Sequence, residues 1–138
     1  MRKGLVAFIA SALALGMPVA AYADTSVSCM YMLMRVYKAE MDACHVPLAP
    51  DRDARYQRLR TGLEGFIRAN AKNDPDKIIS GVETDNIKRA LAGLKSCKSD
   101  DFKYAVQAMD QLTTPDHEKM IQGTLGIPRD PMSGDCSS

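Results

Sequence analysis

The 138-residue sequence has no tryptophan and only three phenylalanines. It also lacks a run of alternating β-branched residues and an Asn-Gly turn, which are the usual signals of strands and hairpins. With so few aromatic rings, aliphatic and methionine side chains must fill most of the core. These absences favour an all-α fold built from amphipathic helices.

The motifs of common enzyme classes are missing as well. The sequence has no HExxH, no GxSxG, no phosphate-binding glycine loop and no C-x-x-C. Its two histidines, His45 and His117, are both expected beside helix ends, which makes a histidine general base difficult to build. The carboxylates beside His117 fit the polar first turn of a helix. We therefore expect a non-enzymatic protein that needs no cofactor.

The N-terminus has the pattern of a secretory signal peptide over residues 1–23. Arg2 and Lys3 precede an uncharged apolar segment, 5–15, and Ala21-Tyr22-Ala23 is a small-x-small cleavage site. The alternative is an uncleaved membrane anchor over residues 5–23, which Gly16 and Pro18 would interrupt. The pattern predicts export to a bacterial periplasm or beyond.

Charge gives no sign of a nucleic-acid or membrane-binding protein. Removing a signal that carries two basic residues and no acidic one leaves 16 basic and 17 acidic residues. Such a balance does not provide the basic surface that nucleic acids require. It also contains no polybasic membrane signal, so we expect no membrane insertion after signal cleavage.

Helical periodicity and capping residues run through the rest of the chain. We expect one helical domain over residues 24–122 and an extended tail over 123–138, rich in Gly, Pro and Ser, that Cys136 tethers. Gly81 interrupts the third helix and Thr84 could cap a second start, so that region is one helix or two. The prediction is a small up-and-down bundle of four to five helices stapled by two disulfides, with helices near 26–43, 51–71 (capped by Asp51), 75–94, 99–112 and 115–122.

The four cysteines of this short exported chain indicate two disulfides. Cys29 and Cys44 lie fifteen residues apart, which is about 22 Å along a continuous helix, too far for a direct bond. If the third helix is unbroken, an up-and-down course favours Cys44–Cys97 with Cys29–Cys136. If the chain reverses near Gly81, Cys29 meets Cys97 instead.

Methionines gather on the first helix and allow two interpretations. Met30 and Met34 lie one turn apart, as do Met41 and His45, and thioethers suit Cu(I) or Ag(I). The same methionines also lie on the apolar stripe that the helix needs for packing. We expect core packing, with a soft-metal site as the alternative.

Two further segments are candidates for partner binding. Arg52, Arg55 and Arg58 could form a basic face on the second helix, although a solvated face that includes nearby acids such as Glu64 is the simpler interpretation. Arg129 lies in "GTLGIPRDPM", an irregular segment that could be a recognition loop. A tether held by Cys136 is the simpler interpretation of that segment.

The layout resembles the small exported immunity proteins that neutralise type VI secretion cell-wall amidases. The resembling residues are Cys29 and Tyr31 at the head of the first helix, Cys44 followed by Pro47, and Cys97 closing "LAGLKSC". The likeness covers residues 29–97 and implies a helical, periplasmic, disulfide-bridged inhibitor of another protein.

Two positions depart from that pattern. Met30 stands where a glycine is expected, and no Phe-Pro precedes Cys97.

The functional prediction is an exported helical protein that binds a protein partner in the periplasm, with inhibitor or immunity protein as its specific form. The alternatives are a soft-metal binding protein and a structural subunit of an envelope assembly, and a homodimer is compatible with each.

Overall fold

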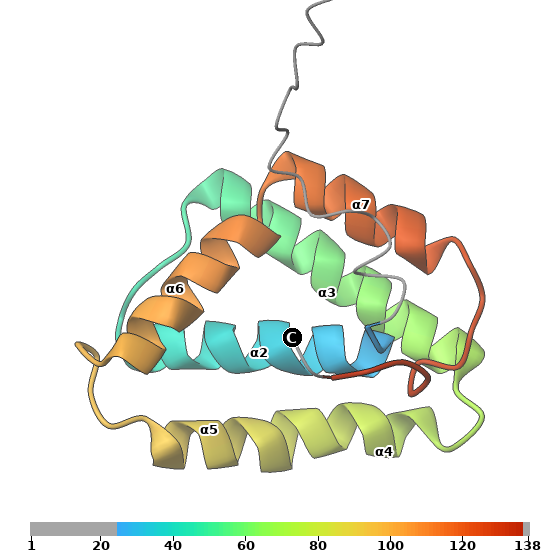
Figure 1. Cartoon of the computed structure of the whole chain (residues 1–138), viewed down its shortest axis with the longest axis horizontal. Helices are drawn as coiled ribbons and strands as arrows, with labels where there is room; N and C mark the ends of the chain where they lie inside the picture. Colours follow the sequence, from blue (N-terminus) through green and yellow to red (C-terminus); the bar gives the residue numbers. More distant parts are fainter. Residues whose placement is uncertain (1–24, 137–138) are drawn as a thin grey trace, which may run out of the picture.

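The computed structural model describes residues 25–136, so the predicted signal peptide lies outside the described residues. The described part is all-α, as predicted, and contains an isolated bridge between Thr25 and Asp135 but no strand. The elements are α2 (Val27–Ala43), α3 (Pro50–Asn70), α4 (Pro75–Ser80), η1 (Gly81–Asn86), α5 (Ile87–Gly93), α6 (Asp100–Leu112) and α7 (Pro115–Leu125). Figure 1 shows α2 in the middle, α6 on one side of it and the α4–α5 helix on the other.

Side-chain caps start most of the helices. Ser26, Ser99 and Thr114 each accept a hydrogen bond from the backbone N–H three residues later, which satisfies a donor that the helix leaves free. The expected cap at Asp51 is wrong. The N-cap of α3 is Ala49, which makes no side-chain bond, and Pro50 occupies the first turn, where its missing N–H costs nothing.

The third helical region is a single continuous helix. Gly81 and Ile87 both have right-handed helical torsions, and the Ile87 N–H donates to the Val82 carbonyl, five residues back. Thr84 does not cap a new helix, because its hydroxyl donates to the Ser80 carbonyl at 2.7 Å. The segment η1 is therefore a π-helical insertion between α4 and α5, the kind of bulge that inserts locally into an α-helix.

The core lies between α2, α3 and the helices that pack on them. Burying a large aliphatic, aromatic or methionine side chain contributes roughly 1.5–3 kcal/mol. By contrast, α5 has no fully buried residue. The buried hydrophobic cluster is Val27, Met30, Tyr31, Met34, Met41, Tyr56, Leu59, Leu63, Phe66, Ile67, Ile79, Val82, Phe102, Met109 and Ile121.

Both disulfides join the pairs that the unbroken third helix favours. Cys44 at the end of α2 is bonded to Cys97 after α5, with the Cα atoms 5.6 Å apart. Cys29 is bonded to Cys136, with the Cα atoms 5.5 Å apart. Two such bridges fit a protein that folds in an oxidising compartment.

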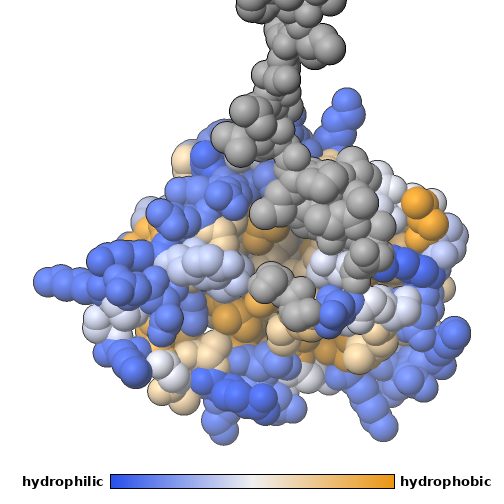
Figure 2. Space-filling view, viewed as in Figure 1, coloured by the Kyte–Doolittle hydropathy of each residue, from blue (hydrophilic) through white to orange (hydrophobic). Residues whose placement is uncertain are grey.

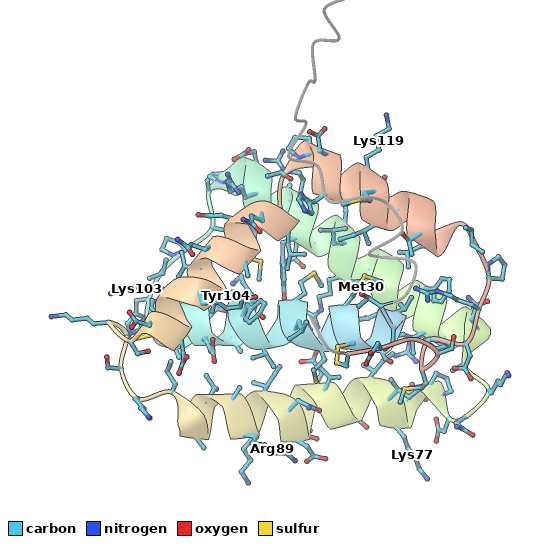
Figure 3. The ribbon with its side chains drawn as sticks, in the orientation of Figure 1. Met30, Lys77, Arg89, Lys103, Tyr104 and Lys119 are labelled. Carbon is cyan, nitrogen blue, oxygen red and sulfur yellow. A yellow bond between two sulfur atoms is a disulfide. The ribbon has the colours of Figure 1, made fainter. Side chains whose placement is uncertain are left out.

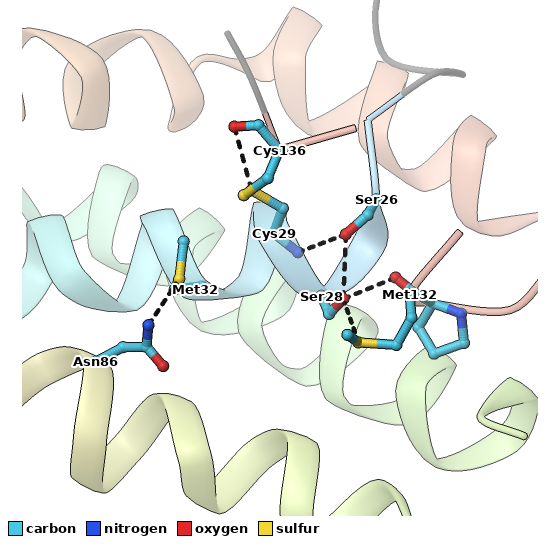
Figure 4. The surroundings of a disulfide bond; sticks show 8 residues. Ser26, Ser28, Cys29, Met32, Asn86, Met132 and Cys136 are labelled. Atoms are coloured by element: carbon cyan, nitrogen blue, oxygen red, sulfur yellow. Dashed lines mark hydrogen bonds between the residues drawn. A yellow bond between two sulfur atoms is a disulfide. The ribbon is translucent and has the colours of Figure 1, made fainter. Parts of the chain in front are cut away.

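The C-terminal segment is packed as well as tethered. It begins three residues later than expected, because α7 continues to Leu125. The Ser28 hydroxyl and backbone N–H both donate to the carbonyl of Pro131, at 2.8 and 3.0 Å, as the close-up in Figure 4 shows for the hydroxyl. Pro131 is fully buried. Within residues 25–136, no helix combines the length and the apolar character needed to cross a membrane.

Candidate functional site

Three of the four arginines proposed for partner binding make their contacts where α3 meets the α6–α7 turn and α7. Arg55 donates from Nε to the carbonyl of Thr113 at 2.5 Å, and Arg52 donates to the Thr113 hydroxyl at 3.2 Å. Arg58 forms a bidentate pair with Glu118, at 2.6 and 3.0 Å. These side chains hold α3 against the α6–α7 turn, and Thr113 there is fully buried.

The fourth arginine lies apart from them. Arg129 donates from Nη2 to the carbonyl of Thr25 at 2.8 Å, so it attaches the C-terminal segment to the start of the helical domain. The structure therefore brings Arg52, Arg55 and Arg58 together at one helix junction, and it does not bring Arg129 to them.

The methionines of the proposed soft-metal site are core residues. Met30, Met34 and Met41 are at most 8% exposed and belong to the hydrophobic cluster. His45 is exposed and lines a shallow hollow of about 300 Å³ beyond the end of α2. No group of three or more His, Cys, Asp or Glu side chains within residues 25–136 could hold a metal ion.

A polar cluster joins α2, α3 and η1 beside the core. Arg35 pairs with Glu83 through two hydrogen bonds, and Tyr31 has its hydroxyl 2.6 Å from Oε1 of Glu83 and 2.9 Å from Oε1 of Glu64. Arg35 also donates to the hydroxyl of Tyr56. The cluster satisfies its members, and no buried side-chain nitrogen or oxygen among the described residues lacks a partner.

The charge states of this cluster are fixed near neutral pH. Two hydrogen bonds from Arg35 lower the pKa of Glu83 to about 2, against the opposing effect of burial. Burial and the adjacent carboxylates raise the pKa of Tyr31 well above its usual value. A phenol that stays protonated and a carboxylate that stays ionised are poorly suited to proton transfer at pH 7. We therefore assign the cluster to holding η1 on α2.

An apolar face remains where α2 passes between α6 and α5. Cys29, Leu33, Val36 and Glu40 are spaced four, three and four residues apart, so they form one stripe along α2. Leu33 and Val36 are half-buried and stand outside the hydrophobic cluster. Figure 2 shows hydrophobic surface in this region of the molecule.

Tyr104 of α6 stands beside that stripe. Its side chain is 57% exposed, and its ring meets the ring of Tyr37 edge to face with the centroids 6.1 Å apart. Figure 3 shows Tyr104 over α2 on the side facing the reader. We call Leu33, Val36, Tyr37 and Tyr104 the α2–α6 face. Sequence reasoning missed this face. The available signal was the position of Tyr104, which lies off the apolar stripe of α6 formed by Phe102, Ala105 and Met109.

One end of the α2–α6 face is acidic. Burial and the nearby charge of Asp101 raise the pKa of Glu40. Asp101 belongs to the first turn of α6, where a carboxylate also interacts favourably with the helix dipole. The face is therefore bounded by two carboxylates at one end and by the Cys29–Cys136 bridge at the other.

Comparison with known proteins adds no relative. No family model, curated protein or solved structure matches the chain. The likeness to the amidase immunity proteins therefore depends only on the residues that carry it.

Proposed function

We propose that this chain is an exported, non-enzymatic helical protein that binds a protein partner in the periplasm through the α2–α6 face. The observation that carries the proposal is the exposed Tyr104, 57% accessible and packed edge-on against Tyr37, beside half-buried aliphatic side chains. Tyrosine combines a large contact area with few rotatable bonds, which is why it is enriched where proteins bind one another.

Two further observations support binding rather than catalysis. The side chains with strongly shifted pKa values are Tyr31, Arg35 and Glu83. They are paired with one another beside the core and keep fixed charges near pH 7. The two disulfides hold both ends of α2, so the face is presented by a preformed scaffold, and a rigid surface loses less entropy on binding. Inhibition or immunity is the specific form of binding that the resemblance suggests.

The test compares two exposed apolar side chains. Tyr104→Asp places a charge in the α2–α6 face, whereas Ile127→Asp changes a side chain that is 67% exposed after α7. In native pull-downs from periplasmic extract, the unmodified chain and Ile127→Asp should recover the same partner and Tyr104→Asp should lose it. Recovery of no partner by the unmodified chain would contradict the proposal.

The soft-metal alternative has no observation in its favour here. Thioether coordination by Met30, Met34 and Met41 would require these buried side chains to leave the hydrophobic cluster. Titration with Cu(I) or Ag(I) under conditions that preserve the disulfides tests this alternative directly, because a soft-metal carrier must take up the ion and no uptake would exclude it.

A further inference from the structure

Some of the positively charged side chains on the described surface are paired with carboxylates, and others are not. Cations of α2 and α3 are paired with carboxylates, among them Arg35, Arg58 and Arg68. Within residues 25–136, the lysines and arginines whose side chains form no ion pair and make no hydrogen bond are Lys72, Lys77, Lys88, Arg89, Lys95, Lys98 and Lys119.

Four of these seven lie close together in the chain. Lys88 and Arg89 are on α5, Lys95 and Lys98 are in the loop after it, and all four are exposed. No acidic residue occurs between Asn86 and Ser99. We call these four residues the basic edge. Figure 3 shows Arg89 pointing away from the helices, at the opposite border of the molecule from Lys119.

Stabilisation of the fold does not account for the basic edge. Cations in the last turn of a helix interact favourably with its dipole, but the last turn of α5 contains no basic residue. The four side chains make no intramolecular pair, and self-repulsion among them is unfavourable. Leu91, three residues after Lys88 and therefore adjacent on the helix surface, is 38% exposed, so apolar area accompanies the charge.

The backbone under the basic edge is held in place. Cys97 lies between Lys95 and Lys98 and is bonded to Cys44 at the end of α2. A cross-linked backbone has already lost much of the freedom that binding would remove, so the charges are partly preorganised. Surface charges are screened beyond about 8 Å at physiological ionic strength, so they act on a partner in contact.

We infer that the basic edge, Lys88, Arg89, Lys95 and Lys98 with Leu91, is a contact surface for an acidic patch on the protein partner. The inference rests on the proposed function, because the acidic patch belongs to the partner bound there. Asp85 precedes the basic edge and Asp100 and Asp101 follow it. A flat anionic membrane would meet these carboxylates too, whereas a bounded acidic patch on a protein avoids them.

The first experiment locates the contact on the full exported chain in its own cells. A photo-crosslinking benzoyl-phenylalanine is placed at Ala92, an exposed position on α5, and in separate chains at Tyr104 and at Lys119. We expect crosslinks to the same protein from Ala92 and Tyr104 and none from Lys119, with an excess of Asp and Glu in the partner segment joined to Ala92.

The second experiment measures the charge dependence with that purified protein. Lys88→Glu with Arg89→Glu should weaken binding by about tenfold or more, and added salt should weaken binding to the unmodified chain. Lys72→Glu with Lys119→Glu is the matched control, because it reverses two exposed, unpaired cations elsewhere and should change the affinity by less than about twofold. Circular dichroism of each variant checks that the fold is retained.

The outcomes separate the two proposals. Crosslinks from Tyr104 without any from Ala92, or equal effects of the two charge reversals, would overturn the basic edge and leave partner binding intact. Absence of crosslinks from every position would count against both. Binding to phosphatidylglycerol vesicles that the reversal at Lys88 and Arg89 abolishes would overturn the inference in favour of a membrane surface.

Discussion

Arg35 on α2 and Glu83 in the π-helical segment η1 form a bidentate ion pair, with Nε 2.6 Å from Oε1 and Nη2 2.7 Å from Oε2. Parallel hydrogen bonds of this kind fix orientation as well as distance. Both side chains are mostly shielded from solvent, with 14% and 28% of their surface accessible. The pair therefore sets how the third helix lies on α2.

Replacing the charged partner should destabilise the protein. Glu83→Gln keeps the size of the side chain but leaves the Arg35 charge without its carboxylate, and we expect a loss of about 2–3 kcal/mol. Urea unfolding followed by circular dichroism measures it. Asp85→Asn, at an exposed position two residues later, is the control and should change the free energy of unfolding by less than about 0.5 kcal/mol. Equal effects of the two substitutions would contradict the role of the pair.

The same pair predicts a pH dependence. The pKa of Glu83 lies at about 2 in the folded state and its usual value is 4.5. Because the folded value is the lower one, its contribution is complete above pH 4.5 and is lost as the pH falls towards 2. We expect the difference in stability between the unmodified chain and Glu83→Gln to be constant above pH 4.5 and to narrow as the pH falls from 4.5 towards 2. A difference that stays constant down to about pH 2 would show that Glu83 does not titrate as described.

The end of α2 offers a stabilising substitution. His45 has φ of 55°, and the N–H groups of His45 and Val46 donate back to the carbonyls of Asp42 and Met41, the pattern of a Schellman motif. Glycine adopts this left-handed conformation without steric cost, so His45→Gly should raise the free energy of unfolding by about 1 kcal/mol. His45→Ala removes the imidazole but keeps the strain, and it should show no such gain in the same urea titration.

The arginines of α3 should act on stability before they act on binding. Arg55→Gln removes the donor to the carbonyl of buried Thr113, and an unsatisfied buried acceptor costs about 1–3 kcal/mol. Lys72→Gln, at an exposed position with no ion pair, should be nearly neutral. Thermal unfolding of both variants checks the prediction. An unchanged melting temperature for Arg55→Gln would return this residue to the list of partner-binding candidates.

The sequence predicts the course of the chain well. Helix caps depend on a few neighbouring residues, and the direction in which each helix runs through the bundle depends only on the number of helices before it. Ser99 and Thr114 start helices as expected, and an unbroken third helix places Cys97 beside Cys44. The π-helical insertion was not predictable, since Gly81 and Thr84 fit either a break or a continuous helix. Only the rotation of η1 on α2 decides that Glu83 meets Arg35.

The candidate surfaces likewise depend on how the helices pack, which the sequence alone does not determine. Which arginines are used internally depends on the position of α7 against α3, so Arg58 could not be assigned to Glu118 in advance. The exposure of Tyr104 likewise depends on how α6 crosses α2. Sequence reasoning also missed the basic edge, although the stretch between Asp85 and Asp100 contains no acidic residue.

The two disulfides close chain segments of different length, with separations of 107 residues for Cys29–Cys136 and 53 for Cys44–Cys97. Loop-closure entropy grows only with the logarithm of the separation, so removing either bridge should cost roughly 4–5 kcal/mol, with the two losses differing by about 0.6 kcal/mol. The paired variants are Cys29→Ala with Cys136→Ala, and Cys44→Ala with Cys97→Ala, compared by urea unfolding. A much smaller loss for the first pair would contradict the loop-closure account, in which the bridge stabilises the protein by restricting the unfolded chain.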